Sequence, residues 1–328
     1  MKRKARPATS LKLKPLGPLF AAEASGVDLR KPLNPAVVRA IEEAMDRYAV
    51  LVFHAQPLSE DEQIAFARSL GPLNAGLRKA TGASTRFKYD EIIDISNVAQ
   101  DGEVVARDDA KLVGAIANQL WHSDSSFQDA PIAYSMLSAV VVPAEGGETE
   151  FADLRAAYNA LPGKIKREIE GLAARHSAFH SRFLLGDDRY TAEQLKVFPS
   201  VDWPLVRMHP GSKRKVLFVG AHCTEILGMT VPEGRMFLAD LIEHATQREF
   251  VHRHEWRSGD LVMWDNRCTL HRGRRYDLSQ RRDLRRTTTE ERTARAAAAS
   301  ENGATRTEPT PPAAPTNGGG EPKLQVIK

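Results

Sequence analysis

The tetrapeptide Trp121-His122-Ser123-Asp124 sets an imidazole and a carboxylate two residues apart. Residues two apart on an extended strand point to the same face, so His122 and Asp124 can present both groups to one metal ion. The chain contains ten histidines, however, and about one His-x-Asp pair is then expected by chance. A surface loop explains the pair equally well, so alone it is weak evidence for a metal site.

A third candidate ligand, His271, comes after the stretch Trp264-Asp265-Asn266-Arg267. Two histidines and one carboxylate form the facial triad of non-haem Fe(II) oxygenases, which leaves coordination positions open for a cosubstrate and dioxygen. An isolated histidine is more often a hydrogen-bonded loop residue. The assignment of His271 therefore depends on the strand predicted next in the chain.

The strand predicted over residues 281–289 carries arginines on both faces. Alternation places Arg282 and Arg286 on one face. The opposite face, interpreted as a salt-bridged surface, carries the other charged residues, Arg281, Asp283 and Arg285. Buried guanidinium groups are costly unless paired, so two of them turned into a barrel predict anionic ligands there, and their planar shape suits two small carboxylic acids. The alternative is an outward-facing arginine ladder.

Local patterns predict helices and strands around these residues. Helices are expected over Pro35–Tyr48, from Ser59 with its capping-box partner Glu62 to Leu70, after the cap Asp153, from Pro162 to about Arg175, and around Leu238–Ala245. Strands are expected over Ala49–Phe53, Tyr134–Val142, Lys215–Val219, Val251–Trp256, Asp260–Trp264 and Arg281–Thr289. Regular alternation of long helices with strands is missing. The pattern favours a mainly β fold with flanking helices, an antiparallel sandwich or barrel of jelly-roll type.

The positive charge of the 328-residue chain is concentrated at its start. The net charge is +4, but residues 1–14 carry six lysines and arginines and no acid, so the remainder has a net charge of −2. We expect a disordered basic arm over residues 1–14 rather than a nucleic-acid-binding one. Residues 291–328 are rich in Ala, Pro, Thr and Gly and predict a disordered tail, which leaves one domain over residues 15–290.

Composition also limits the location and the metal chemistry. No run approaches the roughly 20 apolar residues of a membrane span, and the basic start lacks the apolar segment of a secretory signal, so a cytoplasmic protein is expected. Cys223 and Cys268 are the only cysteines, which excludes a disulfide framework and a cysteine-built zinc site. One isolated disulfide bridge remains open.

A five-part spacing carries a resemblance to a known family. Its parts are His122-x-Asp124, Thr149 at 27 residues beyond His122, His271, and Arg282 and Arg286 at 11 and 15 residues beyond His271. This spacing resembles that of the Fe(II)/2-oxoglutarate-dependent dioxygenases of the taurine dioxygenase superfamily. Longer stretches resemble its aryloxyacetate dioxygenases, namely Arg86–Tyr89, Asn118–Phe127, Tyr134–Pro143, His244–Val251 and Gly259–Cys268. The resemblance runs from about Pro15 to Glu290 and implies a double-stranded β-helix core.

The resemblance also implies roles for the matching residues. His122, Asp124 and His271 would hold Fe(II), which acts with 2-oxoglutarate and O2 as cosubstrates. Arg282, helped by the Thr149 hydroxyl, would bind the distal carboxylate of 2-oxoglutarate. Arg286 would bind the carboxylate of the substrate.

Four further residues are weaker candidates for substrate contacts. Asn118 and the Ser125 backbone are close enough in sequence to the metal ligands to line the same pocket. Lys79 and Lys88 lie in the segment 72–89, which we expect to form a mobile loop over the site. Solvated loop lysines are an equally good interpretation of both.

The implied activity is hydroxylation of the methylene of an aryloxyacetate such as 2,4-dichlorophenoxyacetate, a step of herbicide degradation that gives a phenol, glyoxylate, succinate and CO2. The partner is then a small aryloxy carboxylic acid, without nucleic acid or membrane, and a homo-oligomer is expected by analogy. A sulfonate such as taurine, or another small carboxylic acid, stays open as substrate because a guanidinium binds a sulfonate as readily. A non-catalytic jelly-roll or nucleic-acid-binding protein is the alternative of another class.

Overall fold

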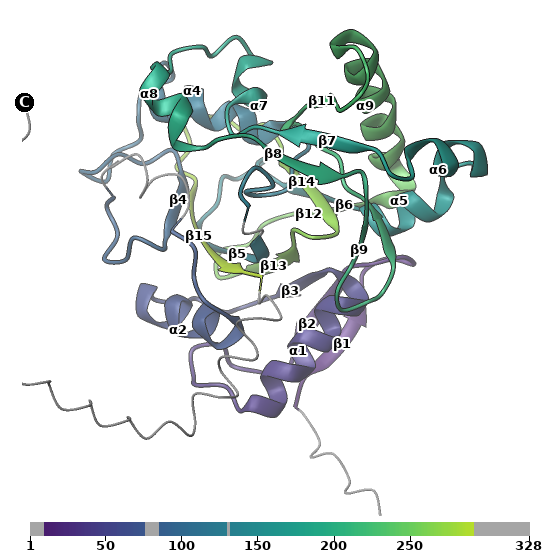
Figure 1. The fold of residues 1–328 in the computed structure, drawn as a ribbon. Coiled ribbons are helices and arrows are strands. Elements are labelled where there is room, and N and C mark those ends of the chain that lie inside the picture. The colour runs from purple at the N-terminus through teal and green to yellow at the C-terminus, as the bar shows by residue number, and fades with distance from the viewer. Residues whose placement is uncertain (1–9, 76–84, 130–131, 292–328) are drawn as a thin grey trace, which may run out of the picture. The chain divides into compact units, whose positions relative to one another are not determined.

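The computed structural model describes residues 10–75, 85–129 and 132–291 (Figure 1). The strands are β1 (Lys12–Pro15), β2 (Ala22–Ser25), β3 (Val50–Phe53), β4 (Ile93–Ser96), β5 (Ile132–Val141), β6 (Thr149–Asp153), β7 (Ala173–His176), β8 (Val201–Pro204), β9 (Val206–Met208), β10 (Lys215–Leu217), β11 (Cys223–Ile226), β12 (Val251–His254), β13 (Leu261–Asp265), β14 (Thr269–Gly273) and β15 (Asp283–Glu290). The helices are α1 (Pro35–Tyr48), α2 (Glu60–Leu70), α4 (Ala110–Ala115), α5 (Leu154–Ala160), α6 (Gly163–Ile169), α7 (His180–Phe183), α8 (Ala192–Val197) and α9 (Val231–Ala245), with short 3-10 helices η1 (Ile116–Gln119) and η2 (Arg248–Phe250).

Two sheets form the centre of the fold. The larger has seven strands in the order β1-β2-β3-β13-β5-β15-β4, and the smaller has three in the order β12-β6-β14. Many neighbouring strands in the larger sheet are distant in sequence. For example, β13 pairs with β3 on one side and with β5 on the other. Among the described strands, every pairing is antiparallel except that of β2 with β3. This is the predicted jelly-roll core with flanking helices.

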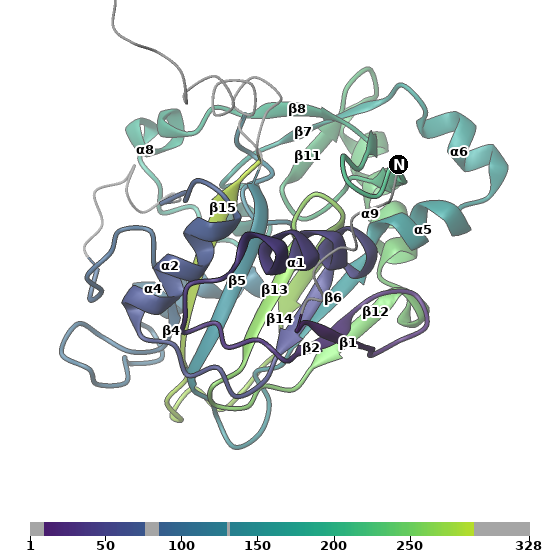
Figure 2. The ribbon, with the colours of Figure 1, turned by 90° about the horizontal axis from the view of Figure 1, so that it is seen from below.

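Strand β13 is buried on both faces because each face has its own hydrophobic core. Val262 and Trp264 point between the two sheets, where the Trp264 ring lies 5.5 Å from the ring of Phe151 on β6. Leu261 and Met263 point the other way, into the core beneath α1 and α2, which cross this face of the sheet in Figure 2. A strand covered on both sides appears in the sequence as a continuous apolar run.

Helices α1 and α2 begin where the sequence predicts. Asn34 accepts a hydrogen bond from the Ala36 N–H at 2.8 Å, and Pro35 supplies the fixed φ of a first helical residue. In α2, Ser59 and Glu62 form the predicted capping box. Both helices therefore start at fixed points and cover the outer face of the larger sheet.

Two sequence predictions are wrong at their ends. The helix expected from Pro162 to about Arg175 ends at Ile169, because Gly171 has a φ of +84° and the chain then forms β7. The disordered arm expected over residues 1–14 is wrong for Lys12–Lys14, which belong to β1 and pair with β2. The patterns also missed β6 and β14, which carry Thr149 and His271.

Two other features agree with the composition. No helix within the described residues is long and apolar enough to cross a membrane. Cys223 and Cys268 are both buried and free, so they form no disulfide bridge.

Candidate metal and cosubstrate site

The fold brings His122, Asp124 and His271 together. His122 and His271 form an isolated antiparallel bridge, in which each backbone N–H donates to the carbonyl of the other at 3.1 and 2.8 Å. Nε2 of His122 lies 3.9 Å from Oδ1 of Asp124, and Nε2 of His271 lies 3.7 Å from Oδ2. All three side chains are buried, and their candidate ligand atoms lie within 4.8 Å of one another. The expected strand through both His122 and Asp124 is wrong, because Asp124 already begins a turn.

The two imidazoles are suited to bind a cation. Nδ1 of His122 lies 2.8 Å from the Leu120 carbonyl oxygen. A carbonyl only accepts, so Nδ1 carries the proton and Nε2 keeps its lone pair toward Asp124. Burial lowers the pKa of His122, and burial together with the nearby His122 lowers the pKa of His271 well below its ordinary value. Both rings are therefore neutral near pH 7.

A chain of buried hydrogen bonds holds Asp124. The Ser135 hydroxyl on β5 donates to Oδ2 of Asp124 at 2.7 Å, and the Asn266 amide donates to the Ser135 oxygen at 2.9 Å. Oδ1 of Asn266 accepts from the Asp124 N–H and from the Trp264 indole. Burial alone would raise the pKa of Asp124, but the Arg286 guanidinium and the Ser135 hydrogen bond help to hold it well below its usual range. The carboxylate is thus ionised and fixed in orientation.

Replacing Ser135 by alanine is expected to weaken metal binding without abolishing it. The change removes a hydrogen bond to an ionised ligand, and loss of such an outer partner lowers metal affinity roughly 10- to 100-fold. Mn(II) titration by calorimetry measures the change. Ser138→Ala is the matched control, since Ser138 is equally buried on β5 but lies on the other face of the strand. Equal losses in both variants would contradict the role given to Ser135.

Arg282 is a buried guanidinium without an acidic partner. Its donors reach only backbone carbonyls, with Nη2 at 3.2 Å from Gly147 O and Nη1 at 3.4 Å from Ile95 O. No carboxylate of the described residues forms an ion pair with it, and burial lowers its pKa. A buried cation of this kind is costly unless an anion joins it. The distal carboxylate of 2-oxoglutarate would be a suitable anion. The alternative of an outward-facing arginine ladder is wrong, because Arg282 is buried.

Gly147 and Tyr276 shape the surroundings of this guanidinium. A Cβ on Gly147 would lie 3.2 Å from Nε of Arg282 and 3.2 Å from Pro143, and the φ of Gly147 is +73°. Glycine is thus required here both for the turn and for the close approach. The ring centroid of Tyr276 lies 5.5 Å from the guanidinium carbon, within range of a cation–π contact.

Arg286 faces the same cavity and forms an ion pair with Asp124. The side chain is 16 % exposed, and its Nε has no partner among the described residues. Arg282, the residue just before β15, and Arg286 within it therefore lie on one side, as predicted. The contact with Asp124 was not foreseen, and it sets the second guanidinium directly beside the candidate metal ligand.

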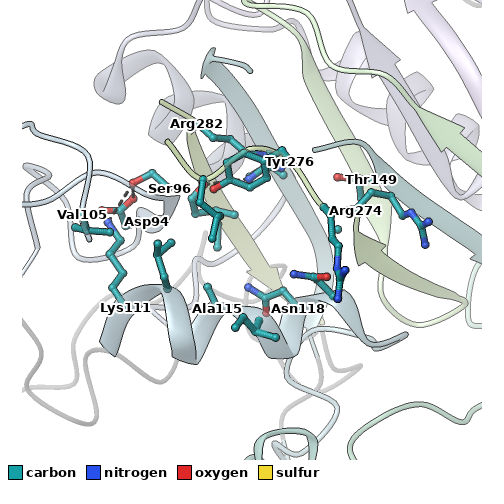
Figure 3. Close-up of a pocket in the computed structure, with 18 of the residues that line it drawn as sticks. Asp94, Ser96, Val105, Lys111, Ala115, Asn118, Thr149, Arg274, Tyr276 and Arg282 are labelled. Carbon is teal, nitrogen blue, oxygen red and sulfur yellow. Dashed lines mark hydrogen bonds and ion pairs between the residues drawn. The ribbon is translucent and has the colours of Figure 1, made fainter. Parts of the chain in front are cut away.

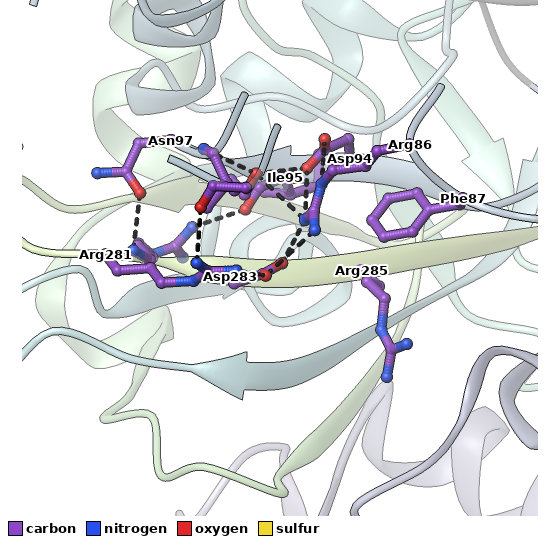
Figure 4. A network of polar contacts seen from close by, with 12 residues as sticks. Arg86, Phe87, Asp94, Ile95, Asn97, Arg281, Asp283 and Arg285 are labelled. Carbon is purple, nitrogen blue, oxygen red and sulfur yellow. Dashed lines mark hydrogen bonds and ion pairs between the residues drawn. The ribbon is translucent and has the colours of Figure 1, made fainter. Parts of the chain in front are cut away.

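The other face of β15 is salt-bridged as predicted, but it is only partly a surface. Asp283 is buried and pairs with Arg86 and Arg281, and Arg86 also binds Asp94 on β4 (Figure 4). Arg285 is half-buried, and its guanidinium donates to the Leu58 carbonyl just before α2. Arg281 stays exposed, whereas Asp283 and Arg285 are covered because Arg86 and β4 lie beside the strand and α2 packs near it, which the sequence pattern did not show.

A cavity of about 790 Å³ adjoins the triad. Figure 3 shows Ala115 and Asn118 of the α4–η1 segment on one side, with Arg282, Tyr276 and Thr149 opposite. Apolar side chains also line it, from Leu112, Ala115, Ile116, Leu137 and Trp264. The cavity thus combines two inward guanidinium groups with apolar wall, which suits acids that carry a hydrophobic body.

The weaker candidates are distributed unevenly. Asn118 lines the cavity. Ser125 is buried beside Asp124 with a φ of +50°, but it is not among the residues that line the cavity. Lys88 is exposed and pairs with Asp61 at 2.8 Å, so the structure does not bring it to the site. Lys79 lies outside the described residues, as does half of the segment 72–89 that was expected to be a loop over the site.

A second buried group of potential ligands, His209, Asp265 and Cys268, is a salt-bridge network instead. Asp265 binds Arg267 through both oxygens and accepts from His209 at 3.0 Å. The nearby guanidinium already neutralises this carboxylate, and it would repel a metal ion. Sequence reasoning missed Ser135, Asn266 and Gly147, whose contacts join residues far apart in the chain.

A jelly roll that buries two histidines and a carboxylate beside an unpaired guanidinium has the architecture of an Fe(II)/2-oxoglutarate-dependent dioxygenase. The chain belongs to the family described as taurine catabolism dioxygenase TauD, TfdA family, whose model matches residues 12–288. This match agrees closely with the extent expected from the sequence. Fe(II) and 2-oxoglutarate are accordingly the metal and the cosubstrate of this enzyme.

Several individual proteins are similar over most of the chain. The alpha-ketoglutarate-dependent 2,4-dichlorophenoxyacetate dioxygenase of Cupriavidus pinatubonensis is 61% identical over 272 residues, covering 83% of this chain and 95% of the relative. The (S)-phenoxypropionate/alpha-ketoglutarate-dioxygenase of Sphingobium herbicidovorans is 38% identical over 276 residues, covering 82% and 91%. The crystal structure of AAD-2 with Mn(II) and N-oxalylglycine has a TM-score of 0.79 and 48% identity, covering 85% of this chain and 96% of that one.

Proposed function

We propose that the protein hydroxylates the methylene of an aryloxyacetate such as 2,4-dichlorophenoxyacetate in an Fe(II)- and 2-oxoglutarate-dependent reaction. The observation that carries this proposal is the cavity that joins Arg282, Arg286 and an apolar wall beside the triad. The relative at 61% identity is named for this substrate and supports the choice. The hydroxylated methylene is a hemiacetal, which breaks down to a phenol and glyoxylate, while 2-oxoglutarate gives succinate and CO2.

Each group of residues would have its own task. His122, Asp124 and His271 would hold Fe(II), which together with 2-oxoglutarate and dioxygen supplies an oxidant for a carbon–hydrogen bond. Arg282 and Thr149 would bind the distal carboxylate of the cosubstrate. Arg286 would hold the carboxylate of the substrate and so bring the adjoining methylene to the metal.

The apolar wall would receive the aromatic ring. Leu112 and Ile116 come from the α4–η1 segment, and Leu137 comes from β5, so the wall is built by two elements. A ring packed there displaces water from the cavity, which protects the oxidation from side reactions. A small sulfonate such as taurine would leave this surface uncovered, and the aryloxy acid is therefore the better fit.

A substrate screen tests the proposal. We expect succinate and phenol from aryloxyacetates in the presence of Fe(II) and 2-oxoglutarate. Aryloxypropionates, cinnamates and taurine are tested as alternative substrates in parallel assays. Higher turnover of taurine than of any aryloxyacetate would favour the small-acid alternative. Absence of Fe(II)-dependent succinate formation with every acid would favour a non-catalytic protein. Homo-oligomer formation stays a prediction from the resemblance, and a cytoplasmic location stays a prediction from the composition.

A further inference from the structure

The Thr149 hydroxyl has a fixed acceptor side. The indole Nε1–H of Trp256 donates to the Thr149 oxygen at 3.0 Å. An indole N–H can only donate, so the hydroxyl must accept in this bond and keeps its own proton for another group. Among the described residues no acceptor is in place for that proton. Thr149 is 4% exposed and lines the cavity, which leaves the proton directed to a ligand.

The contacts of Trp256 hold its indole in place. Its ring meets the ring of His254 edge to face, with centroids 4.6 Å apart and planes at 89°. His254 lies directly opposite Thr149 in the pairing of β12 with β6, and its Nε2 is 3.1 Å from Oδ2 of the buried Asp260. Trp256 itself does not line the cavity. It therefore acts on a ligand only through Thr149.

Arg282 belongs to the same end of the cavity. It donates to the carbonyl of Gly147, two residues before Thr149. A carboxylate that pairs with Arg282 is an acceptor, and the free proton of Thr149 matches it. We propose that Trp256 is a positioning residue that turns the Thr149 hydroxyl into a donor for the distal carboxylate of the 2-oxo acid, and so favours dicarboxylic over monocarboxylic 2-oxo acids; this inference rests on the proposed function.

Trp256→Phe tests the inference, because it removes the N–H and keeps an aromatic ring. The probes are N-oxalylglycine and oxamate, each titrated by calorimetry into protein loaded with Mn(II). Oxamate keeps the chelating end and lacks the distal carboxylate. We expect N-oxalylglycine to bind about fivefold more weakly, as for loss of one hydrogen bond, and oxamate to bind unchanged. Trp203→Phe is the control, since it also loses an indole hydrogen bond, to the Ser126 carbonyl.

A double-mutant cycle identifies Thr149 as the intermediary. Thr149→Val should weaken N-oxalylglycine binding about as much or more, and adding Trp256→Phe should then have no further effect. Thr149→Ser keeps a hydroxyl and should retain both the affinity and the sensitivity to Trp256→Phe. Additive losses would show that Trp256 does not act through Thr149, and would overturn the inference.

The outcomes separate the two proposals. If the parent protein with Mn(II) does not bind N-oxalylglycine, the proposed function fails. If it binds, but Trp256→Phe weakens the binding of neither probe or weakens the binding of both equally, only the inference fails. If the variant does not fold, the Zn(II)-loaded, ¹⁵N-labelled parent protein is used: the Trp256 indole N–H resonance should shift with N-oxalylglycine and much less with oxamate. Equal shifts with both probes would overturn the inference.

Discussion

His271→Ala is expected to abolish both turnover and tight binding of Mn(II) or Fe(II). The change removes one of three candidate ligands from a buried site, where the remaining His122 and Asp124 cannot enclose a cation. The loss should exceed the roughly 10- to 100-fold effect of removing an outer partner such as Ser135. Calorimetric titration with Mn(II), together with succinate formation under Fe(II), measures the two effects.

The control for this variant is His244→Ala. His244 packs on Phe250 and bonds the Ala157 carbonyl from α9, so its loss costs packing and a hydrogen bond without touching the triad. We expect a lower melting temperature and unchanged Mn(II) affinity. Near-parental Mn(II) affinity in His271→Ala would refute the triad, whatever happens to activity.

The sequence placed Arg282 and Arg286 on one face correctly because the alternation of β15 extends to Arg282, the residue before the strand. The pairing with β5 shifts between Asp283 and Leu284, where Asp283 pairs with Val141 and Leu284 with Ala139. The skipped residue, Val140, is thus on β5, and the period of two along β15 is undisturbed. Had the extra residue been on β15, Arg282 and Arg286 would have faced opposite sides.

Other elements lacked a readable pattern. Strands β6 and β14 are five residues long and carry Thr149 and His271 at positions where hydrophobic alternation would place apolar side chains. Functional residues override local pattern in such places. The helix after Pro162 was predicted too long because the stop signal of Gly171 was outweighed by apolar spacing.

The hydrogen bonds that orient the metal ligand Asp124 could not be predicted from the sequence. Ser135 and Asn266 are 131 residues apart and meet only because β5 and β13 are neighbours in the sheet. Strand pairing over such a separation leaves no local signal. The ligand triad was recognisable from its spacing, whereas the hydrogen bonds that orient Asp124 required the folded chain.

The two inward arginines should fail in different ways when each is replaced by alanine. Arg282→Ala removes the partner of a buried carboxylate, which costs on the order of 2–5 kcal/mol, or roughly 30- to 4,000-fold in 2-oxoglutarate affinity. Arg286→Ala should lower that affinity far less, by no more than its shared effect on the metal site through Asp124. Arg285→Ala is the control on the same strand, since its guanidinium contacts the Leu58 carbonyl and not the cavity. Cosubstrate binding is measured with N-oxalylglycine and Mn(II).

Arg286→Ala should also weaken the binding of the substrate, and this specific loss should appear only where the substrate carries a negative charge. Arg286 also pairs with Asp124, so its loss disturbs the metal site for every ligand alike. Comparing an aryloxyacetate with its neutral aryloxyacetamide removes this shared effect, because the comparison is a double-mutant cycle with the substrate as one partner. We expect the acid to lose most of its affinity in the variant. The amide, which binds weakly to the parent protein, should lose little further affinity. Equal losses for acid and amide would make Arg286 a support for Asp124 alone, and the substrate carboxylate would need another anchor.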